Sequence, residues 1–182
     1  MRRRQKLTEN VCSHCQTGYK NVELPKRKPT RLKDYDYSTP GAYFITICTK
    51  DRKEMLSKII VGDDALIVPE NHISNYGLIC DKYIKNINIK YENVIVNKYV
   101  IMPNHIHLII FLNGTMRASS PTKNIETIIR SFKTMVTKEI GNSIWQRSYH
   151  DHIIRSEKDY QKIWEYIDTN VIRWEKDCFY NN

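Results

Sequence analysis

The stretch VIMPNHIHLIIF, residues 100–111, places two histidines inside an otherwise apolar run. Such a run predicts a buried β-strand, in which alternate side chains point to the same face. His105 and His107 therefore share one face, while Ile106 points to the other. Two imidazoles on one rigid strand form half of a metal site. The alternative is a pair of core histidines that bond to their neighbours, and this stretch alone leaves both interpretations open.

The flanking segments predict an α+β domain, a largely antiparallel sheet with packed helices. Aromatic and β-branched runs indicate strands, and apolar residues at helical spacing beside capping residues indicate helices. We expect strands over residues 42–49, 94–103, 105–112 and 143–155, and helices over residues 74–91, 124–141 and from Ser156 through Trp174. Pro103 and Asn104 would make the turn of a hairpin that puts the histidines in the centre of the sheet. The order of elements lacks the alternation of a doubly wound fold.

The length of 182 residues, 41% of them hydrophobic, suits one domain with a sizeable core. We expect a basic, flexible arm over residues 1–22 and a folded domain over residues 23–182. No apolar run approaches the ~20 residues of a membrane helix, and the start MRRRQKL lacks the apolar segment of a signal peptide. A cytoplasmic protein without a membrane partner is expected.

Charge and cysteine content narrow the class of partner. The formal net charge is +9, and the basic residues concentrate in MRRRQK and PKRKPTRLK, within the first 33 residues. This balance favours a polyanion, although a solvated basic tail would have the same composition. Five cysteines without a secretory signal indicate reduced thiols. The CSHC segment at Cys12–Cys15 has zinc-knuckle spacing but lacks a second pair, so we expect no structural zinc.

The last predicted helix offers a third ligand and a nucleophile. Tyr166 and Asn170 are four residues apart, so a phenol and an amide oxygen can face one site. Tyr160 is a competing nucleophile, but its neighbour four residues on is Trp164, which cannot bind a metal. Tyrosines at the interface of a helix and a core are common, so this spacing alone decides little.

A second His-x-His pair competes with the first. His150 and His152 flank Asp151 and have polar neighbours, which is typical of a strand end or a sheet edge. Histidines in such places are more often surface groups than ligands. We keep His152 as a residue that could support the site or contact DNA.

Four segments carry a resemblance to a known family. RLKDYDYSTPGAYFITICTKDRK, YVIMPNHIHLII, IWQRSYHDHIIRSEKDY and YIDTNVIRWEKD occur in this order, in a match over roughly residues 23–180. Together they resemble the REP-associated tyrosine transposases, relatives of the single-tyrosine insertion-sequence transposases in the HUH nuclease superfamily. The family usually has proline after the asparagine, where this chain has Val171, and losing it could lengthen the helix. The first ~21 residues match nothing in the family.

The resemblance implies a site and a reaction. His105, His107 and Asn170 would bind Mg²⁺ or Mn²⁺, and Tyr166 would attack a phosphate of single-stranded DNA to leave a 5′-phosphotyrosine and a 3′-OH. The substrate would be DNA with hairpin-forming or palindromic repeats, and the enzyme a nucleoid-associated monomer or homodimer. Basic side chains would hold the backbone. The candidates for DNA contact are Lys26, Arg27, Lys28, Arg31, Lys33, Lys133, Arg147, His152 and Arg155.

Three other functions fit parts of the sequence. One is a replication-initiator or relaxase-like nicking enzyme with the same chemistry, which the single tyrosine and the small size disfavour. Another is a domesticated DNA-binding protein that keeps the fold without cleavage, against which the intact set of His105, His107, Tyr166 and Asn170 argues. The last is an unrelated basic RNA-binding module with a fortuitous histidine pair.

Overall fold

The computed structural model describes residues 31–60, 69–114 and 124–180. The predicted arm over residues 1–22, with its CSHC segment, and the candidates Lys26, Arg27 and Lys28 lie outside the described residues. Within the described ranges, every helix is too short or too polar to cross a membrane.

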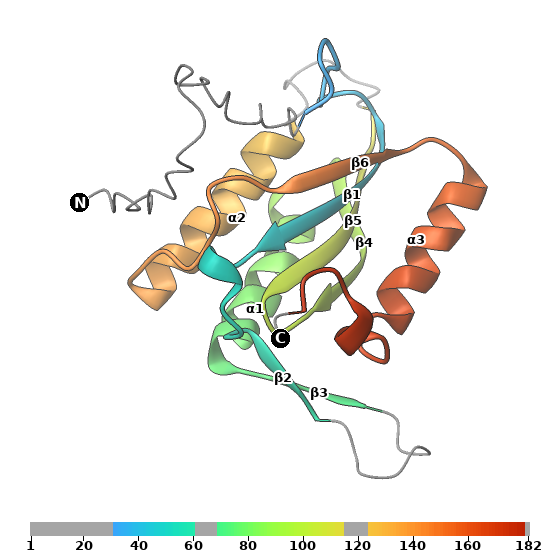
Figure 1. The fold of residues 1–182 in the computed structure, drawn as a ribbon. Coiled ribbons are helices and arrows are strands. Elements are labelled where there is room, and N and C mark those ends of the chain that lie inside the picture. Colours follow the sequence, from blue (N-terminus) through green and yellow to red (C-terminus); the bar gives the residue numbers. More distant parts are fainter. Residues whose placement is uncertain (1–30, 61–68, 115–123, 181–182) are drawn as a thin grey trace, which may run out of the picture.

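A four-stranded antiparallel sheet forms the centre of the molecule (Figure 1). Its strands, in spatial order, are β4 (Val94–Ile101), β5 (His105–Leu112), β1 (Gly41–Cys48) and β6 (His150–Ile154). Hydrogen bonding on both sides keeps β5 away from the edges, and its register pairs His105 with Cys48 and His107 with Thr46. The predicted hairpin and the interior position of the histidines are therefore confirmed.

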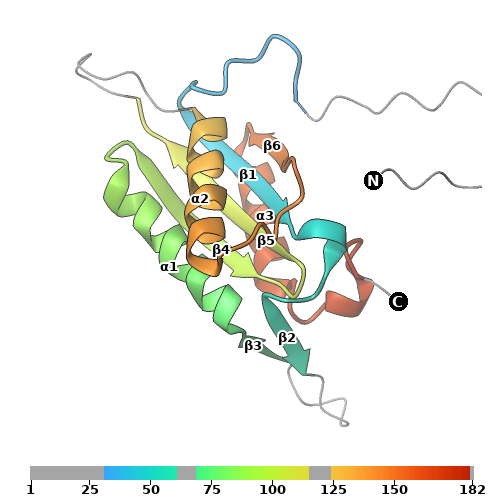
Figure 2. The same ribbon diagram turned by 90° about the vertical axis from the view of Figure 1, so that its left-hand side faces the viewer.

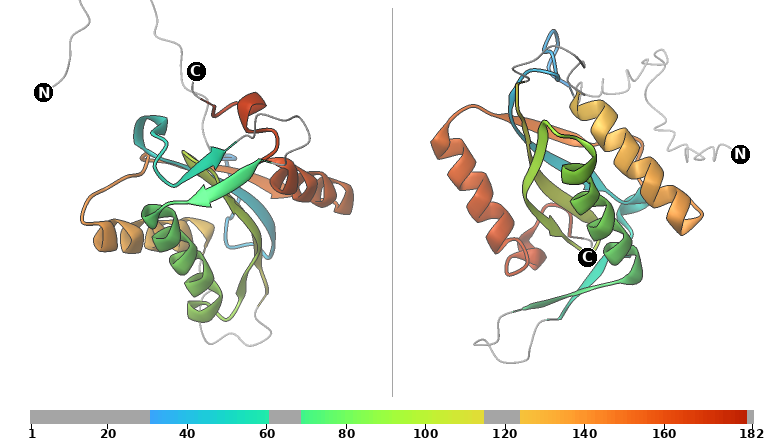
Figure 3. Two further views of the ribbon diagram at one scale, coloured as in Figure 1. Left: turned by 90° about the horizontal axis from the view of Figure 1, so that it is seen from below. Right: turned by 180° about the vertical axis from the view of Figure 1, so that it is seen from behind.

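Helices cover the two faces of the sheet unequally. Helices α1 (Asn75–Lys90) and α2 (Ile125–Ile140) lie across one face, and α3 (Glu157–Thr169) lies beyond the other face (Figures 2 and 3). Each helix begins after a side-chain cap, in which Ser74, Asn124 or Ser156 accepts a hydrogen bond from a backbone N–H of the first turn. Helix α2 ends at Gly141, whose φ of 86° is readily adopted by glycine. The expected α+β class is confirmed.

Strand β5 contributes side chains to both faces of the sheet, because successive side chains point in opposite directions. Ile106, Leu108 and Ile110 are fully buried in the apolar core, together with the inward residues of α1 and α2. On the opposite face, Phe111 contacts Tyr160 of α3, with ring centroids 5.8 Å apart. The histidines belong to this second face, so the core on the first face holds their strand rigid.

Two predicted boundaries were wrong, and one hairpin was missed. The strand expected over residues 143–155 is reduced to β6, because the ladder with β1 extends only from Ala42 to Thr46. Residues 144–146 instead bond to the chain at the end of β1, where the backbone N–H of Lys50 donates to Ile144 O at 2.7 Å. Strands β2 (Ser57–Ile60) and β3 (Glu70–Ile73) form a separate two-stranded sheet, which the sequence analysis did not predict.

The final helix is shorter than the sequence predicted. Helix α3 stops at Thr169 with Asn170 as its C-cap, although this chain has Val171 in place of the family's proline. The chain then turns into a short 3₁₀ helix, η2 (Trp174–Lys176). Trp174 is buried with its ring centroid 5.9 Å from that of His105. Burying this indole requires the chain to turn back toward the sheet, so tertiary packing ends the helix.

Candidate metal and nucleophile site

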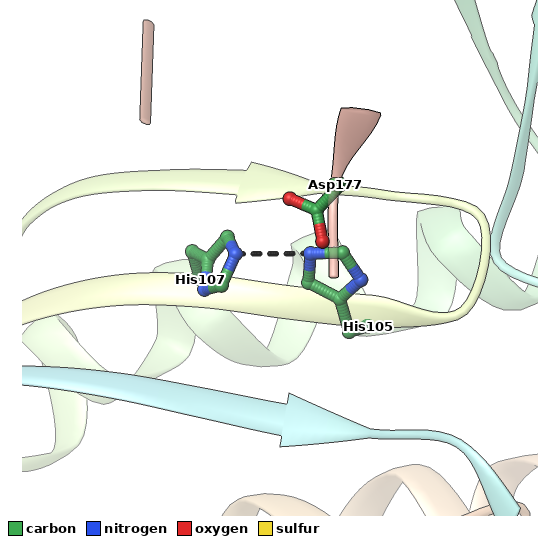
Figure 4. A group of neighbouring side chains, drawn as sticks. All are labelled: His105, His107 and Asp177. Atoms are coloured by element: carbon green, nitrogen blue, oxygen red, sulfur yellow. Dashed lines mark hydrogen bonds between the residues drawn. The ribbon is translucent and has the colours of Figure 1, made fainter. Parts of the chain in front are cut away.

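His105 and His107 point toward one another from the same face of β5. Their Nε2 atoms are 2.9 Å apart, and both side chains are buried, with exposures of 0% and 1% (Figure 4). Burial lowers the pKa of His105 to about 3, an effect to which the Arg52 guanidinium adds. Burial and the neighbouring His105 hold the pKa of His107 well below its ordinary value. Both imidazoles are therefore neutral near pH 7, which is the form that binds a metal.

A second hydrogen bond orients each imidazole. The Nδ1–H of His105 donates to Asn104 Oδ1 at 2.8 Å, and Nδ1 of His107 lies 2.8 Å from the hydroxyl of Thr46. The amide oxygen of Asn104 only accepts, so the proton of His105 sits on Nδ1 and its Nε2 lone pair faces the site. Partners of this kind fix the ring of a metal-binding histidine.

Helix α3 brings Tyr166 and Asn170 to the same place. The Tyr166 hydroxyl lies 3.3 Å from Nε2 of His107, and Asn170 is buried with an exposure of 2%. The amide oxygen of Asn170 is buried, and among the described residues it has no hydrogen-bond partner. An unpaired buried amide oxygen is a ready ligand for a hard cation.

Asp177 completes the cluster and was not predicted. Its Oδ2 accepts hydrogen bonds from the Tyr166 hydroxyl at 3.0 Å and from Nδ2 of Asn170 at 2.9 Å. His105, His107 and Asp177 each offer a ligand atom, and these atoms all lie within 4.8 Å of one another, so the three could hold a metal ion. Figure 4 shows the carboxylate beside the imidazoles. We call the five residues His105, His107, Tyr166, Asn170 and Asp177 the metal pocket.

Sequence spacing could not reveal Asp177. The helix that the sequence predicted runs through Trp174, about 12 Å beyond Tyr166 along the axis, and Asp177 lies three residues past that end. The turn after Thr169 returns it to the pocket. The only signal was its presence in YIDTNVIRWEKD, the segment that also contains Tyr166 and Asn170.

The Tyr166 hydroxyl is held in its neutral form. Burial, together with the charge of Asp177 and its hydrogen bond, raises the pKa of Tyr166 above its ordinary value. A neutral phenol is a weak nucleophile, so attack would need positive charge close to its oxygen. Such charge could come from a cation held by the two imidazoles.

The C-terminal segment around Phe179 covers the metal pocket. The ring of Phe179 lies 4.6 Å from that of His105, and its carbonyl accepts a hydrogen bond from Nδ2 of Asn104 at 2.7 Å. Arg52 donates to Cys178 O at 3.1 Å and lies over the Phe179 ring. These contacts account for the near-complete burial of the histidines.

The competing candidates lie elsewhere. The Tyr160 hydroxyl accepts a hydrogen bond from Nδ2 of Asn97 at 2.6 Å, and its ring packs on Trp164. His150 and His152 are exposed, and His152 pairs with Asp159 at 2.8 Å. Within the described ranges, neither histidine joins a group of three possible metal ligands.

The candidates for DNA contact that the structure describes gather near β6. Arg31, Lys133 and Arg147 line one cavity of about 530 Å³, which we call the basic groove, and Arg31, His152 and Arg155 line another of about 380 Å³. Arg31 is already paired with Asp151 at 2.5 Å. Lys33 is exposed in a turn and lines neither cavity. Six predicted residues are thus placed, and five of them share this region.

Comparison with known proteins agrees with the geometry. Residues 38–170 match the family described as IS200-like transposases. An uncharacterized protein of Haemophilus influenzae is 34% identical over 180 residues, covering 88% of this chain and 96% of that protein. A second protein of that organism, provisionally named a REP-associated tyrosine transposase, is 28% identical over 148 residues, covering 76% of this chain and 74% of that protein.

A solved structure shares the fold. The structure of a REP-associated tyrosine transposase bound to a REP hairpin superposes with a TM-score of 0.57 at 20% identity, covering 79% of this chain and 74% of that one. The family match spans β1, the histidine pair and α3 through Asn170, and so includes four of the five residues of the metal pocket, while Asp177 lies beyond it. This chain belongs to the family of IS200-like transposases.

Proposed function

We propose that this transposase is a metal-dependent endonuclease and strand transferase for single-stranded DNA, with Tyr166 as its nucleophile. The observation that carries the proposal is the position of the Tyr166 hydroxyl, 3.3 Å from Nε2 of His107 in a pocket with further ligand atoms. Tyr160, on the same helix, bonds to Asn97 of β4 instead. One tyrosine of the helix is therefore available to a phosphate held at the histidines.

The residues of the pocket fit Mg²⁺ or Mn²⁺. His105 and His107 supply neutral nitrogens, and the unpaired amide oxygen of Asn170 and the carboxylate of Asp177 supply hard oxygens. When bound, a divalent ion would polarise the scissile phosphate and offset its developing negative charge.

The reaction uses Tyr166 directly. Its phenolic oxygen attacks phosphorus, a P–O bond to tyrosine forms, and the bond from phosphorus to the 3′ oxygen breaks. The phenol loses its proton, the departing 3′ oxygen gains one, and the 5′ phosphate remains on the enzyme. Attack by another 3′-OH reverses the step and joins strands. Asp177 accepts hydrogen bonds from the phenol of Tyr166 and from the amide of Asn170, and so holds both side chains in place before the reaction.

The substrate is DNA that forms a hairpin. The related solved protein was bound to a REP hairpin, and this chain carries a formal net charge of +9 that favours a polyanion. A transposase of this kind would work on chromosomal DNA, in the cytoplasm.

A second candidate function is hairpin binding without cleavage. It is favoured by the closed pocket, since Phe179 covers His105 and leaves it with an exposure of 0%. A DNA strand can reach Tyr166 by two routes only. Either residues 177–180 shift, or the DNA enters beside α3. The two functions differ in whether a covalent adduct forms.

The test uses a labelled hairpin with an unpaired 5′ extension, incubated with Mn²⁺ and separated on a denaturing gel. Wild-type protein should form a covalent adduct, Tyr166→Phe should form none, and both should bind the hairpin equally, because the hydroxyl contributes little to holding the strand. Tyr160→Phe is the matched control and should keep the adduct. An adduct that persists in Tyr166→Phe and disappears in Tyr160→Phe would refute the assignment of the nucleophile.

A further inference from the structure

Helix α3, which carries Tyr166, is attached to the sheet by little apolar surface. Ile167 is the one buried residue of α3, whereas α2 buries five of its residues. Burial of apolar side chains is the main force that fixes a helix on a sheet, so Ile167 alone leaves the rotation of α3 about its axis weakly determined. The helix lies next to β4 (Figure 1), and contacts with that strand can set the rotation.

Lys98 of β4 contacts α3 at two successive turns. Its ammonium group forms an ion pair with the carboxylate of Asp168, and its Nζ lies 4.1 Å from the centroid of the Trp164 ring. The Lys98 side chain is only 19% exposed, so water weakens these contacts less than those of a fully exposed pair. Because Trp164 and Asp168 are four residues apart, one ammonium group holds the helix at both points.

A β-bulge places Lys98 and its neighbour Asn97 against the same helix. The register of β4 with β5 shifts between Val96 and Lys98, so Asn97 is an extra residue in β4. In a regular strand, the side chains of residues 97 and 98 would point to opposite faces of the sheet. The bulge instead lets Nδ2 of Asn97 donate to the Tyr160 hydroxyl at 2.6 Å while Lys98 reaches Asp168. Bulges often redirect side chains beside active sites, and this one directs two polar groups at α3.

The side chains that Lys98 contacts lie on the opposite side of α3 from Tyr166. Trp164 and Asp168 are each two residues from Tyr166, which is ~200° of helical rotation, or about 160° by the shorter way. A rotation that shifts one side of the helix therefore shifts the phenol as well. A rotation of ~10° moves an atom at the ~5–6 Å outer radius of a helix by about 1 Å. A displacement of that size can slow a reaction up to ~100-fold.

We propose that Lys98 is a positioning residue, which sets the rotation of α3 and thereby keeps the Tyr166 hydroxyl beside the metal pocket. The distance of 3.3 Å from that hydroxyl to Nε2 of His107 depends on this rotation. The inference rests on the proposed function for the role of Tyr166 as nucleophile. Because Lys98 acts through α3, it governs the rate of attack and leaves the affinities for metal and DNA unchanged.

The first test compares Lys98→Met, which removes the charge from a side chain of similar length, with Lys98→Arg, which keeps the charge. At saturating hairpin and Mn²⁺, Lys98→Met should form the covalent adduct about 10- to 100-fold more slowly than wild type. Its affinity for the hairpin in EDTA and its affinity for Mn²⁺ should equal those of wild type. Lys98→Arg should recover most of the rate, because a guanidinium can also pair with Asp168 and lie over Trp164.

The matched control removes a lysine ion pair from another helix. Lys85 pairs with Asp81 at 2.7 Å on α1, which lies on the other face of the sheet. Lys85→Met should therefore form the adduct at the wild-type rate, and thermal denaturation confirms that each variant folds. Equal rates for Lys98→Met and wild type, or a failure of Lys98→Arg to recover the rate, would overturn the inference.

A second measurement needs neither metal nor DNA, and so separates this inference from the proposed function. The centroids of the Tyr166 and His107 rings are 5.2 Å apart, which is close enough for nuclear Overhauser cross-peaks between ring protons. These cross-peaks should weaken in Lys98→Met. Those between His105 and Phe179, whose ring centroids are 4.6 Å apart, should persist and show that the rest of the pocket is intact.

The two measurements assign any failure to its source. Unchanged cross-peaks between Tyr166 and His107 in Lys98→Met would refute the positioning role of Lys98, whatever the protein does to DNA. Weakened cross-peaks support that role even if wild-type protein forms no adduct, a result that would count against the proposed chemistry alone.

Discussion

The metal pocket and the basic groove handle polar groups in opposite ways. In the pocket, His105 and His107 are buried and neutral, and each has a defined hydrogen-bond partner. In the basic groove, Lys138 and Arg147 are exposed lining residues that keep their charge in contact with water. Burying a charge without a partner costs several kcal/mol, so the two fully buried imidazoles are neutral, whereas the carboxylate of Asp177 is only half-buried and accepts two hydrogen bonds. The metal pocket is therefore suited to binding a metal and reacting at short range. The basic groove is suited to attracting a polyanion over a longer distance.

The largest effect should come from removing the two imidazoles together. His105→Ala with His107→Ala should abolish both Mn²⁺ binding by the free protein and the metal-dependent DNA adduct, because the remaining oxygens cannot hold the ion. Calorimetric titration with Mn²⁺ and the denaturing-gel assay measure the two effects. His72→Ala with His150→Ala, at exposed positions on β3 and β6, should change neither. Metal-dependent cleavage by the His105/His107 variant would disprove the pocket as the metal site.

The second prediction separates the two possible oxygen ligands. Asn170→Ala removes the unpaired amide oxygen, and Asp177→Asn keeps the size of the side chain but removes its charge. Each substitution should lower the Mn²⁺ affinity about 10- to 100-fold if its oxygen is a ligand or orients one. If only Asp177→Asn has this effect, the sequence-based choice of Asn170 as third ligand is wrong. If only Asn170→Ala has it, Asp177 serves mainly to hold Tyr166.

The burial of the histidines predicts a dependence of stability on pH. Their pKa values in the folded protein lie below 6.5, reaching about 3 for His105, so the unfolded chain binds more protons as pH falls through 6.5. The free energy of unfolding should therefore decrease by up to about 1.4 kcal/mol per pH unit for each histidine between pH 6 and 5. Chemical denaturation at several pH values measures this slope.

A direct observation of the two rings checks the same prediction. In NMR spectra, the ring signals of His105 and His107 should stay unchanged from pH 7 to pH 5, while the exposed His72, His150 and His152 provide the comparison within the same spectrum. Titration of both buried rings near pH 6.5 would show that the pocket is open to solvent.

The smallest effect concerns Lys133 on the floor of the groove. Burial lowers the pKa of Lys133 to about 8, so this side chain loses its charge between pH 7 and pH 9. Hairpin affinity should fall a few-fold over that range, with a loss of about 0.9 from the salt slope. Lys133→Met, which has no charge at either pH, should show a smaller change. A wild-type affinity that is equal at pH 7 and pH 9 would remove Lys133 from the DNA-binding surface.

The sequence by itself determined the parts of the pocket that depend on local periodicity. The two-residue repeat of a strand puts His105 and His107 on one face, and the turn of a helix puts Tyr166 beside Asn170. The register of β5 with β1 agrees with the placement of the histidines. The position of α3, which brings the Tyr166 hydroxyl to His107, agrees with the placement of Tyr166. The helical position of Tyr160 likewise disfavours it as the nucleophile, and its hydroxyl bonds to Asn97 instead.

Only the tertiary structure decided the parts that depend on where distant segments meet. Asp177 enters the pocket because Trp174 is buried and the chain turns back after Thr169, and no periodic pattern encodes that turn. The groove likewise requires residues 143–149 to run beside α2, which sequence reasoning had placed in a longer strand. Repeats along the chain fix which way neighbouring side chains point, whereas contacts between remote segments follow from packing of the whole core.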